Sequence, residues 1–165
     1  MNTENGSITF EFDEFSGAPW EFSDCHGPVR KSNNGHNAYS SDKRPGERPL
    51  NSADRNAYQF YYDWQKAMKM AKRDGWNAAP YDAPNKALRA VQRDFDYLRG
   101  WVNGEWSYVF VTVEYEGETE SVGAVETYND YHMEMGNEML ANLIARVEKE
   151  RAERDYWGSR DVCTV

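Results

Sequence analysis

The sequence has no long apolar run and very little cysteine. Its 165 residues contain no stretch near the length that crosses a bilayer, which is about 20 consecutive apolar residues. The opening residues, MNTENGSITF, lack the basic-then-apolar order of a secretory signal. Cys25 and Cys163 are too few and too far apart for a disulfide framework. We therefore expect reduced thiols, no association with a membrane, and a cytoplasmic location.

Signatures of nucleotide cradles and of paired metal ligands are also absent from the sequence. There is no G-x-x-x-x-G-K-[ST] run and no strand-linked G-x-G-x-x-G. No C-x2-C pair is followed by a spaced histidine pair, which structural zinc sites require. The sequence therefore predicts neither a cofactor nor a bound metal.

Basic residues are missing from two long segments, although the chain as a whole has a net charge of −9. Residues 1–24 contain six acids and residues 100–138 contain nine, with no base in either segment. Residues 25–99 contain fourteen bases and eight acids. An exposed face that collects the acids would repel nucleic acid and attract proteins that bind it. We therefore expect no direct binding to DNA.

Apolar periodicity predicts about three helices. Asp63 can N-cap the first, which Gly75 would end after Asp74. Asn85 or Asp82 can cap the second, which reaches about Val102. A third is expected over about residues 130–155, before Gly158.

β-Branched and aromatic residues predict an antiparallel sheet of about three or four strands. The clearest strand covers Trp106 to Glu116 and should be central, with a turn at 116–118 into a second strand over 121–127. Tyr58–Tyr62 reads as a short strand, and ITFEF at residues 8–12 as an edge strand. The prediction is an α+β fold in one domain over 1–165, with a loop-rich region at 1–57 and the core at 58–157.

The stretch PWEFSDCHGPV, residues 19–29, combines an acid, a thiol and an imidazole. As neighbours, Cys25 and His26 usually diverge, which disfavours a thiol nucleophile activated by that imidazole. Asp24, Cys25, His26 and His36 offer metal-ligand types without a paired spacing. The structural interpretation is favoured: Trp20 anchors a loop that turns at Gly27 and Pro28.

The acidic segment after residue 105 is the most distinctive feature of the sequence. In an alternating strand Glu114 and Glu116 point to the same side, and further acids follow without a base. Three interpretations apply: a solvated edge that resists aggregation, a surface that copies the phosphates of a nucleic acid, or paired carboxylates for acid–base chemistry. The candidate partner-binding residues are Glu114, Glu116, Glu118, Glu120, Glu126, Asp130 and Glu134.

Several short motifs together resemble a family of small proteins encoded by tailed phages and prophages, which share a PWE..D.HGPV motif. The resemblance covers roughly residues 19–128, and the family often has glycine where this chain has Cys25. It implies a phage or prophage source and no particular site residues. The matching stretches are 19–21, 24–29, 43–47, 60–63 and 74–76.

The sequence thus leads to two main functional hypotheses. The first is an acidic phage accessory protein with no catalytic role, acting in anti-defence as an inhibitor in the host cytoplasm. It would bind a host nucleic-acid-handling protein, such as a restriction, CRISPR or recombination-repair nuclease, as a DNA mimic. The alternative is a small enzyme acting on a nucleotide or nucleic-acid-derived signal through Glu21, Asp24 and His26, with the 43–48 loop on phosphate. A third hypothesis is a homo-oligomer that pairs through its aromatic and apolar stripes.

Overall fold

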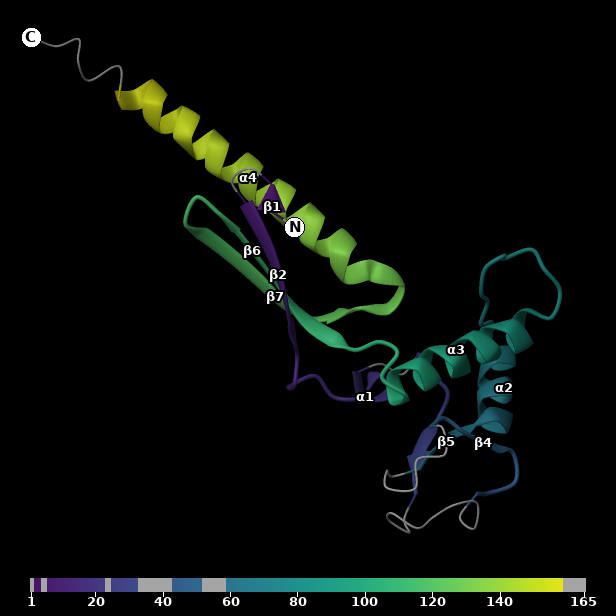
Figure 1. Cartoon of the computed structure of the whole chain (residues 1–165). Coiled ribbons are helices and arrows are strands. Elements are labelled where there is room, and N and C mark those ends of the chain that lie inside the picture. The colour runs from purple at the N-terminus through teal and green to yellow at the C-terminus, as the bar shows by residue number, and fades with distance from the viewer. Residues whose placement is uncertain (1, 4–5, 23–24, 33–42, 52–58, 159–165) are drawn as a thin grey trace, which may run out of the picture. The chain divides into compact units, whose positions relative to one another are not determined.

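The computed structural model describes residues 2–3, 6–22, 25–32, 43–51 and 59–158 (Figure 1). These residues form a mixed α+β structure, which confirms the predicted fold class. They divide into two compact units. Unit 1 comprises Met1–Ser16 and Ser107–Val165, and unit 2 comprises Gly17–Trp106. The boundary expected near residue 58 therefore falls inside unit 2, and unit 1 combines segments from both ends of the sequence.

Unit 1 contains a four-stranded antiparallel sheet in the order β1-β2-β6-β7. Its strands are β1 (Asn2–Thr3), β2 (Gly6–Phe12), β6 (Tyr108–Tyr115) and β7 (Glu118–Glu126). The expected central position of β6 is confirmed. The ITFEF segment forms most of β2, but it is not an edge strand, because the short β1 pairs with its outer side.

A two-residue turn joins β6 to β7 as the sequence predicted. Tyr115 pairs with Glu118, and the turn residues Glu116 and Gly117 have φ values of 51° and 87°. Positive φ at both positions is typical of the type I′ turn that matches the twist of a β-hairpin. Gly117 adopts this conformation at no steric cost, whereas Glu116 is a less usual occupant.

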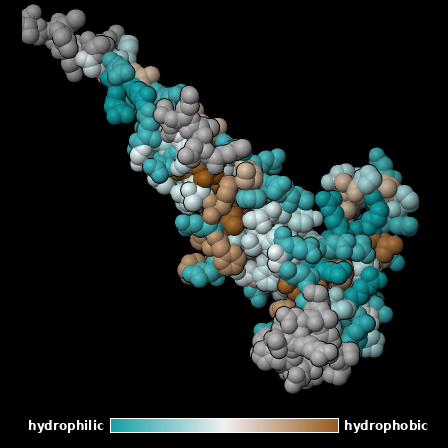
Figure 2. Space-filling view, viewed as in Figure 1, coloured by the Kyte–Doolittle hydropathy of each residue, from teal (hydrophilic) through white to brown (hydrophobic). Residues whose placement is uncertain are grey.

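The 28-residue helix α4 (Tyr131–Gly158) covers one face of this sheet, after a short 3-10 turn at Tyr128–Asp130. Its buried residues Leu140, Leu143 and Val147 pack against Val113 and Tyr115. Residues 148–158 are all exposed, and Figure 1 shows this part of α4 running past the hairpin. That part of the helix is mostly hydrophilic (Figure 2).

The carboxylate of Asp13 fixes an irregularity in β7, where the pairing register shifts and Ala124 has a φ of 56°. Asp13 Oδ2 accepts hydrogen bonds from Ala124 N at 2.9 Å and from Ser16 Oγ at 2.8 Å. Burial opposes the charge of this carboxyl, but hydrogen bonds from Ala124, Ser16 and Phe15 outweigh it and lower its pKa. The charged Asp13 therefore stabilises the bulge in unit 1.

Unit 2 contains a second antiparallel sheet, in the order β3-β5-β4, and three helices. The described residues thus form two small sheets, because the strands between residues 29 and 63 pair with one another and not with the sheet of unit 1. The strands are β3 (Val29–Lys31), β4 (Glu47–Pro49) and β5 (Phe60–Asp63). The helices are α1 (Pro19–Phe22), α2 (Trp64–Arg73) and α3 (Lys86–Val102).

The two helices predicted in this part of the sequence are present with nearly the expected bounds. Asp63 caps α2, since its side chain accepts the Lys66 N–H at 2.9 Å. Asn85 precedes α3 in a left-handed conformation, without a capping bond from its side chain. The strand expected from Trp106 begins two residues later, because Trp106 is buried in unit 2 and donates its indole N–H to Tyr97 O at 2.8 Å.

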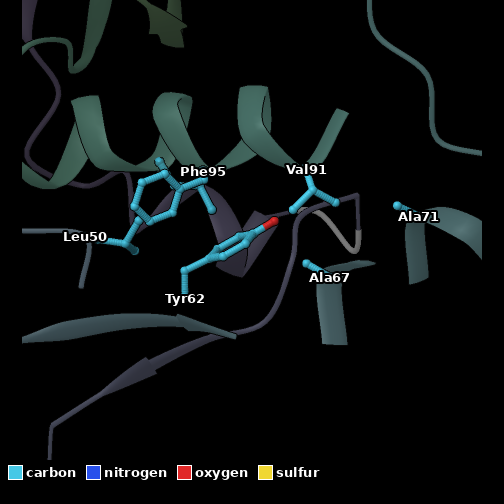
Figure 3. Close-up of a cluster of buried hydrophobic side chains, with 7 residues drawn as sticks. Leu50, Tyr62, Ala67, Ala71, Val91 and Phe95 are labelled. Carbon is cyan, nitrogen blue, oxygen red and sulfur yellow. The ribbon is translucent and has the colours of Figure 1, made fainter. Parts of the chain in front are cut away.

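The core of unit 2 lies between β5, α2 and α3 (Figure 3). Tyr62 is fully buried there with Leu50, Val91 and Phe95. Ala67 and Ala71 form the buried side of α2, which leaves its lysines exposed as the sequence indicated. The phenol of Tyr62 points from this core toward α3 (Figure 3).

Within the described part of the chain, no helix is both long enough and apolar enough to span a membrane.

Candidate functional sites

A hydrogen-bonded cluster in unit 2 links the PWEFSDCHGPV loop to β5 and α3. His26 Nδ1 lies 2.6 Å from Asp94 Oδ1. Asp94 Oδ2 accepts the Gly27 N–H and the Tyr62 O–H, each at 2.7 Å. The carboxylate thus contacts three groups from two separate segments, and we call His26, Gly27, Tyr62 and Asp94 the His26 cluster.

The cluster is largely closed to water, so its hydrogen bonds are strong. The Asp94 side chain is only 9% exposed, and Tyr62 is fully buried. Burial and the nearby charge of Asp94 raise the pKa of Tyr62 above its ordinary value, so its phenol stays protonated and donates. A buried carboxylate that keeps all its donors is stabilising, whereas one that loses them leaves unsatisfied groups in the core.

His26 is held in a defined orientation. Its ring stacks almost parallel to that of Tyr97, with centroids 5.5 Å apart and an interplanar angle of 9°. The side chain retains 19% exposure, and no described residue forms a hydrogen bond with Nε2. In the neutral tautomer whose Nδ1 proton is donated to Asp94, the lone pair of Nε2 is available as a base. Asp94 and Tyr97 thus fix the orientation of the His26 imidazole, as the orienting residues of a catalytic histidine do.

Of the other residues predicted with His26, the two that the structure describes, Glu21 and Cys25, are not part of this cluster. Glu21 accepts the Ala18 N–H at 3.2 Å and thereby caps the start of α1. Cys25 is an exposed thiol. Asp24 and His36 lie outside the described residues. Among the residues that are described, no group of three or more His, Cys, Asp or Glu side chains is placed to hold a metal.

Asp94 is the member of the cluster that sequence reasoning missed. It lies 68 residues from His26, so no local spacing connects the two. The available signal was its position in α3, since an acid three residues after Val91 and four before Leu98 lies on the buried stripe. A carboxylate on a buried apolar stripe needs a hydrogen-bond donor from another part of the fold, because burying an unpaired charge is costly.

The structural interpretation of the loop also has support from its anchors. Trp20 packs against Phe60 and Trp101, with ring centroids 5.4 and 5.3 Å apart. The backbone of Gly27 lies against the Tyr62 ring, and a Cβ at this position would be 2.3 Å from the phenol oxygen. The loop is thus fixed to the core of unit 2 by an indole and by a close backbone contact.

We expect Gly27→Ala to destabilise unit 2. A methyl group there must displace the buried Tyr62 side chain, and overpacking of this kind costs about 1–3 kcal/mol. Chemical denaturation followed by tryptophan fluorescence would measure the change. Gly158→Ala is the control, because a Cβ at Gly158 meets no atom within 4 Å. Equal stability of the two variants would contradict the close contact between the loop and Tyr62.

The second candidate site is the acidic hairpin of unit 1, whose acids divide between two faces of the sheet. Glu118 and Glu120 pair with Tyr115 and Val113, so they share the face that α4 covers. Glu114 lies between Val113 and Tyr115 in β6, so its side chain points to the opposite face of the sheet. The acids of the hairpin therefore do not share one face of the sheet.

Arginines from α4 approach two of the hairpin acids, although no base is near them in the sequence. Arg146 forms an ion pair with Glu120, and Arg151 forms one with Glu116. Both arginines come from the second half of α4. Glu114 and Glu118 are exposed and form no ion pair with a described residue.

The remaining acids of the predicted surface lie at the other end of the hairpin. Glu126 ends β7 and is half-buried. Asp130, which ends the 3-10 turn, and Glu134, in the first turn of α4, are exposed. At about 3.3 Å per residue, the length of β7 separates these acids from the turn by roughly 25 Å. The seven acids of the predicted surface thus form two groups, one at the turn and one at the opposite end of the hairpin.

Charge is divided strongly between the two units. Unit 1 has 17 acidic and 5 basic residues, a net charge of −12, whereas unit 2 has 11 acidic and 14 basic residues, a net charge of +3. An excess of one charge this large influences which partners a protein attracts and how soluble it is. The acidity of the protein is therefore a property of unit 1 alone.

Comparison of the chain with protein-family models, with curated proteins and with solved structures finds no match. The chain is thus described by its own geometry: an α+β protein with a strongly acidic unit and a buried His–Asp cluster.

Proposed function

We propose that the protein is a phage-encoded anti-defence protein that acts by binding. Its acidic unit 1 would occupy the basic surface with which a host nuclease or other nucleic-acid-handling protein binds DNA. The observation that carries this proposal is the separation of charge, with a net −12 in unit 1 against +3 in unit 2. The proposal that the protein acts in the cytoplasm of a bacterial host rests on the resemblance to phage and prophage proteins.

The turn end of the hairpin is the contact we assign first. Glu114 and Glu118 are exposed carboxylates with no intramolecular ion pair among the described residues, so a partner's lysines or arginines can approach them. Glu116 and Glu120 are held by arginines of α4, and Glu126, Asp130 and Glu134 extend the surface at the far end. The two groups of acids could contact a groove of the partner that normally binds the two phosphate backbones of a DNA duplex.

Affinity capture from a bacterial host lysate tests the proposal. We expect the wild-type chain to retain a nucleic-acid-binding protein that the Glu114→Lys/Glu118→Lys variant does not retain. Reversal of these two acids leaves both arginine pairs intact, so the fold of unit 1 should be unchanged. Recovery of the same proteins by both baits would argue against the hairpin as the binding surface.

The alternative, a small enzyme, is favoured by one observation, the positioned imidazole of His26. In this version Asp94, rather than Asp24 or Glu21, would orient His26, and Nε2 would accept a proton from water or a hydroxyl. Metal analysis and a nucleotide-turnover screen of wild-type and His26→Ala proteins separate the hypotheses. Turnover that is lost with His26 would support the enzyme.

A further inference from the structure

Exposed basic residues in unit 2 lie on helix α2 and in residues 43–48, which precede it in the chain. We define the basic face as Lys43, Arg44, Arg48, Lys66, Lys69 and Lys72, all of which are exposed. From this surface we infer that unit 2 binds single-stranded nucleic acid, with the lysines on phosphates and Arg48 against a base.

Helix α2 supplies half of the basic face. Its ten residues, WQKAMKMAKR, contain no acid. Ala67 and Ala71 are buried, and at 100° per residue Lys66, Lys69 and Lys72 lie on the opposite arc of the helix. The neighbouring Arg73 is already paired with Asp74 through two bonds of 2.6 and 2.7 Å. The three lysines are thus free of acids within their own helix.

The turn before β4 brings the other basic residues to the start of α2. Trp64 N donates to Gly46 O at 3.1 Å, which fixes the turn against the first residue of the helix. The acid in this turn, Glu47, is buried and binds Arg30 through two bonds of 2.9 and 2.8 Å. The Arg30 hydrogen bonds outweigh burial and lower the Glu47 pKa, so its charge is satisfied internally.

The guanidinium of Arg48 provides a stacking surface. Its central carbon lies 3.4 Å from the centroid of the Trp64 ring, so the two planes are in contact. Arg48 is exposed, which leaves its outer face open to a flat ligand. Proteins that bind single strands combine a basic track with aromatic or arginine planes on which bases stack. Carboxylates of an acidic protein would not use such a plane, so the observations favour a nucleic acid.

Asp63, the acid that precedes α2, reduces the charge of the basic face only slightly. Asp63 Oδ2 is 4.0 Å from Lys66 Nζ, and this carboxylate already caps α2. The net charge of −9, which argued against nucleic acid, lies in unit 1 rather than in unit 2. Binding should therefore depend on salt and be strongest at low ionic strength.

Fluorescence anisotropy with the full chain tests this inference, using a labelled 20-nucleotide oligo-dT and a duplex of the same length. We expect the single strand to bind more tightly, with a dissociation constant in the micromolar range at low salt. Lys66→Gln/Lys69→Gln/Lys72→Gln should weaken binding at least tenfold and reduce the slope of log K against log salt by about 2, since each phosphate contact in a single strand contributes about 0.7.

Two further variants separate charge from stacking. Lys86→Gln/Arg93→Gln/Arg99→Gln removes the same charge from exposed positions on α3 and should change binding less than threefold. Arg48→Lys keeps the charge but loses the planar group, and should weaken oligo-dT binding about fivefold without changing inorganic polyphosphate binding. Absence of oligo-dT binding, equal losses in both triple variants, preference for duplex, or equal binding of polyglutamate would each overturn the inference.

Discussion

Replacing Asp94 with alanine is expected to destabilise unit 2 by about 3–5 kcal/mol, the range for removing one partner from a buried charged network. The substitution removes the acceptor of three contacts at 2.6–2.7 Å. It leaves the Tyr62 hydroxyl in a fully buried position and the Gly27 N–H without an acceptor. Because many domains have only about 5–15 kcal/mol of stability, this loss would be a large fraction of the stability of unit 2.

Urea denaturation monitored by tryptophan fluorescence would measure this loss. Asp94→Asn keeps the shape and one acceptor oxygen, so its cost should be smaller, about 1–3 kcal/mol. Asp96→Ala is the matched control, since Asp96 is exposed on the same helix and contacts Gln92. A cost for Asp94→Ala no larger than that for Asp96→Ala would contradict the role assigned to the cluster.

Reversing the charge of Glu114 and Glu118 is expected to weaken binding to the captured partner at least 100-fold. Each substitution replaces an attractive contact with a like-charge contact, and unfavourable juxtapositions of this kind cost several kcal/mol at an interface. Titration calorimetry or surface plasmon resonance with the purified partner would measure the change. The difference between the proteins should shrink as salt is raised, because exposed charges are screened.

Glu148→Lys/Glu150→Lys is the control for that measurement. It makes the same change in net charge at exposed positions of α4, within the same unit. If this control weakens binding as much as the hairpin variant, the partner responds to total charge and the hairpin is not the contact surface.

The local signals in the sequence were sufficient for most of the fold. The alternating valines of residues 109–113, the turn at Gly117 and the capping Asp63 each specify their element through short-range chemistry. The division into two units could not be predicted in the same way. It depends on β2 pairing with β6 across about a hundred residues, a choice set by packing between distant segments.

The candidate sites show the same limit. His26 was visible as a chemical group, but its partner Asp94 comes from a helix 68 residues away. The hairpin acids were also visible, but Arg146 and Arg151 reach two of them only because α4 folds back along the sheet. A net charge read from the whole sequence described neither unit, since it averages −12 and +3.

The most direct test of the proposed function is displacement of the captured host protein by DNA. Wild-type protein is immobilised, loaded with its partner, and washed with increasing duplex DNA at physiological salt. We expect DNA to release the partner, and excess wild-type protein to block the partner's binding to DNA. A complex that forms equally well in saturating DNA would contradict the claim that unit 1 occupies a nucleic-acid-binding surface.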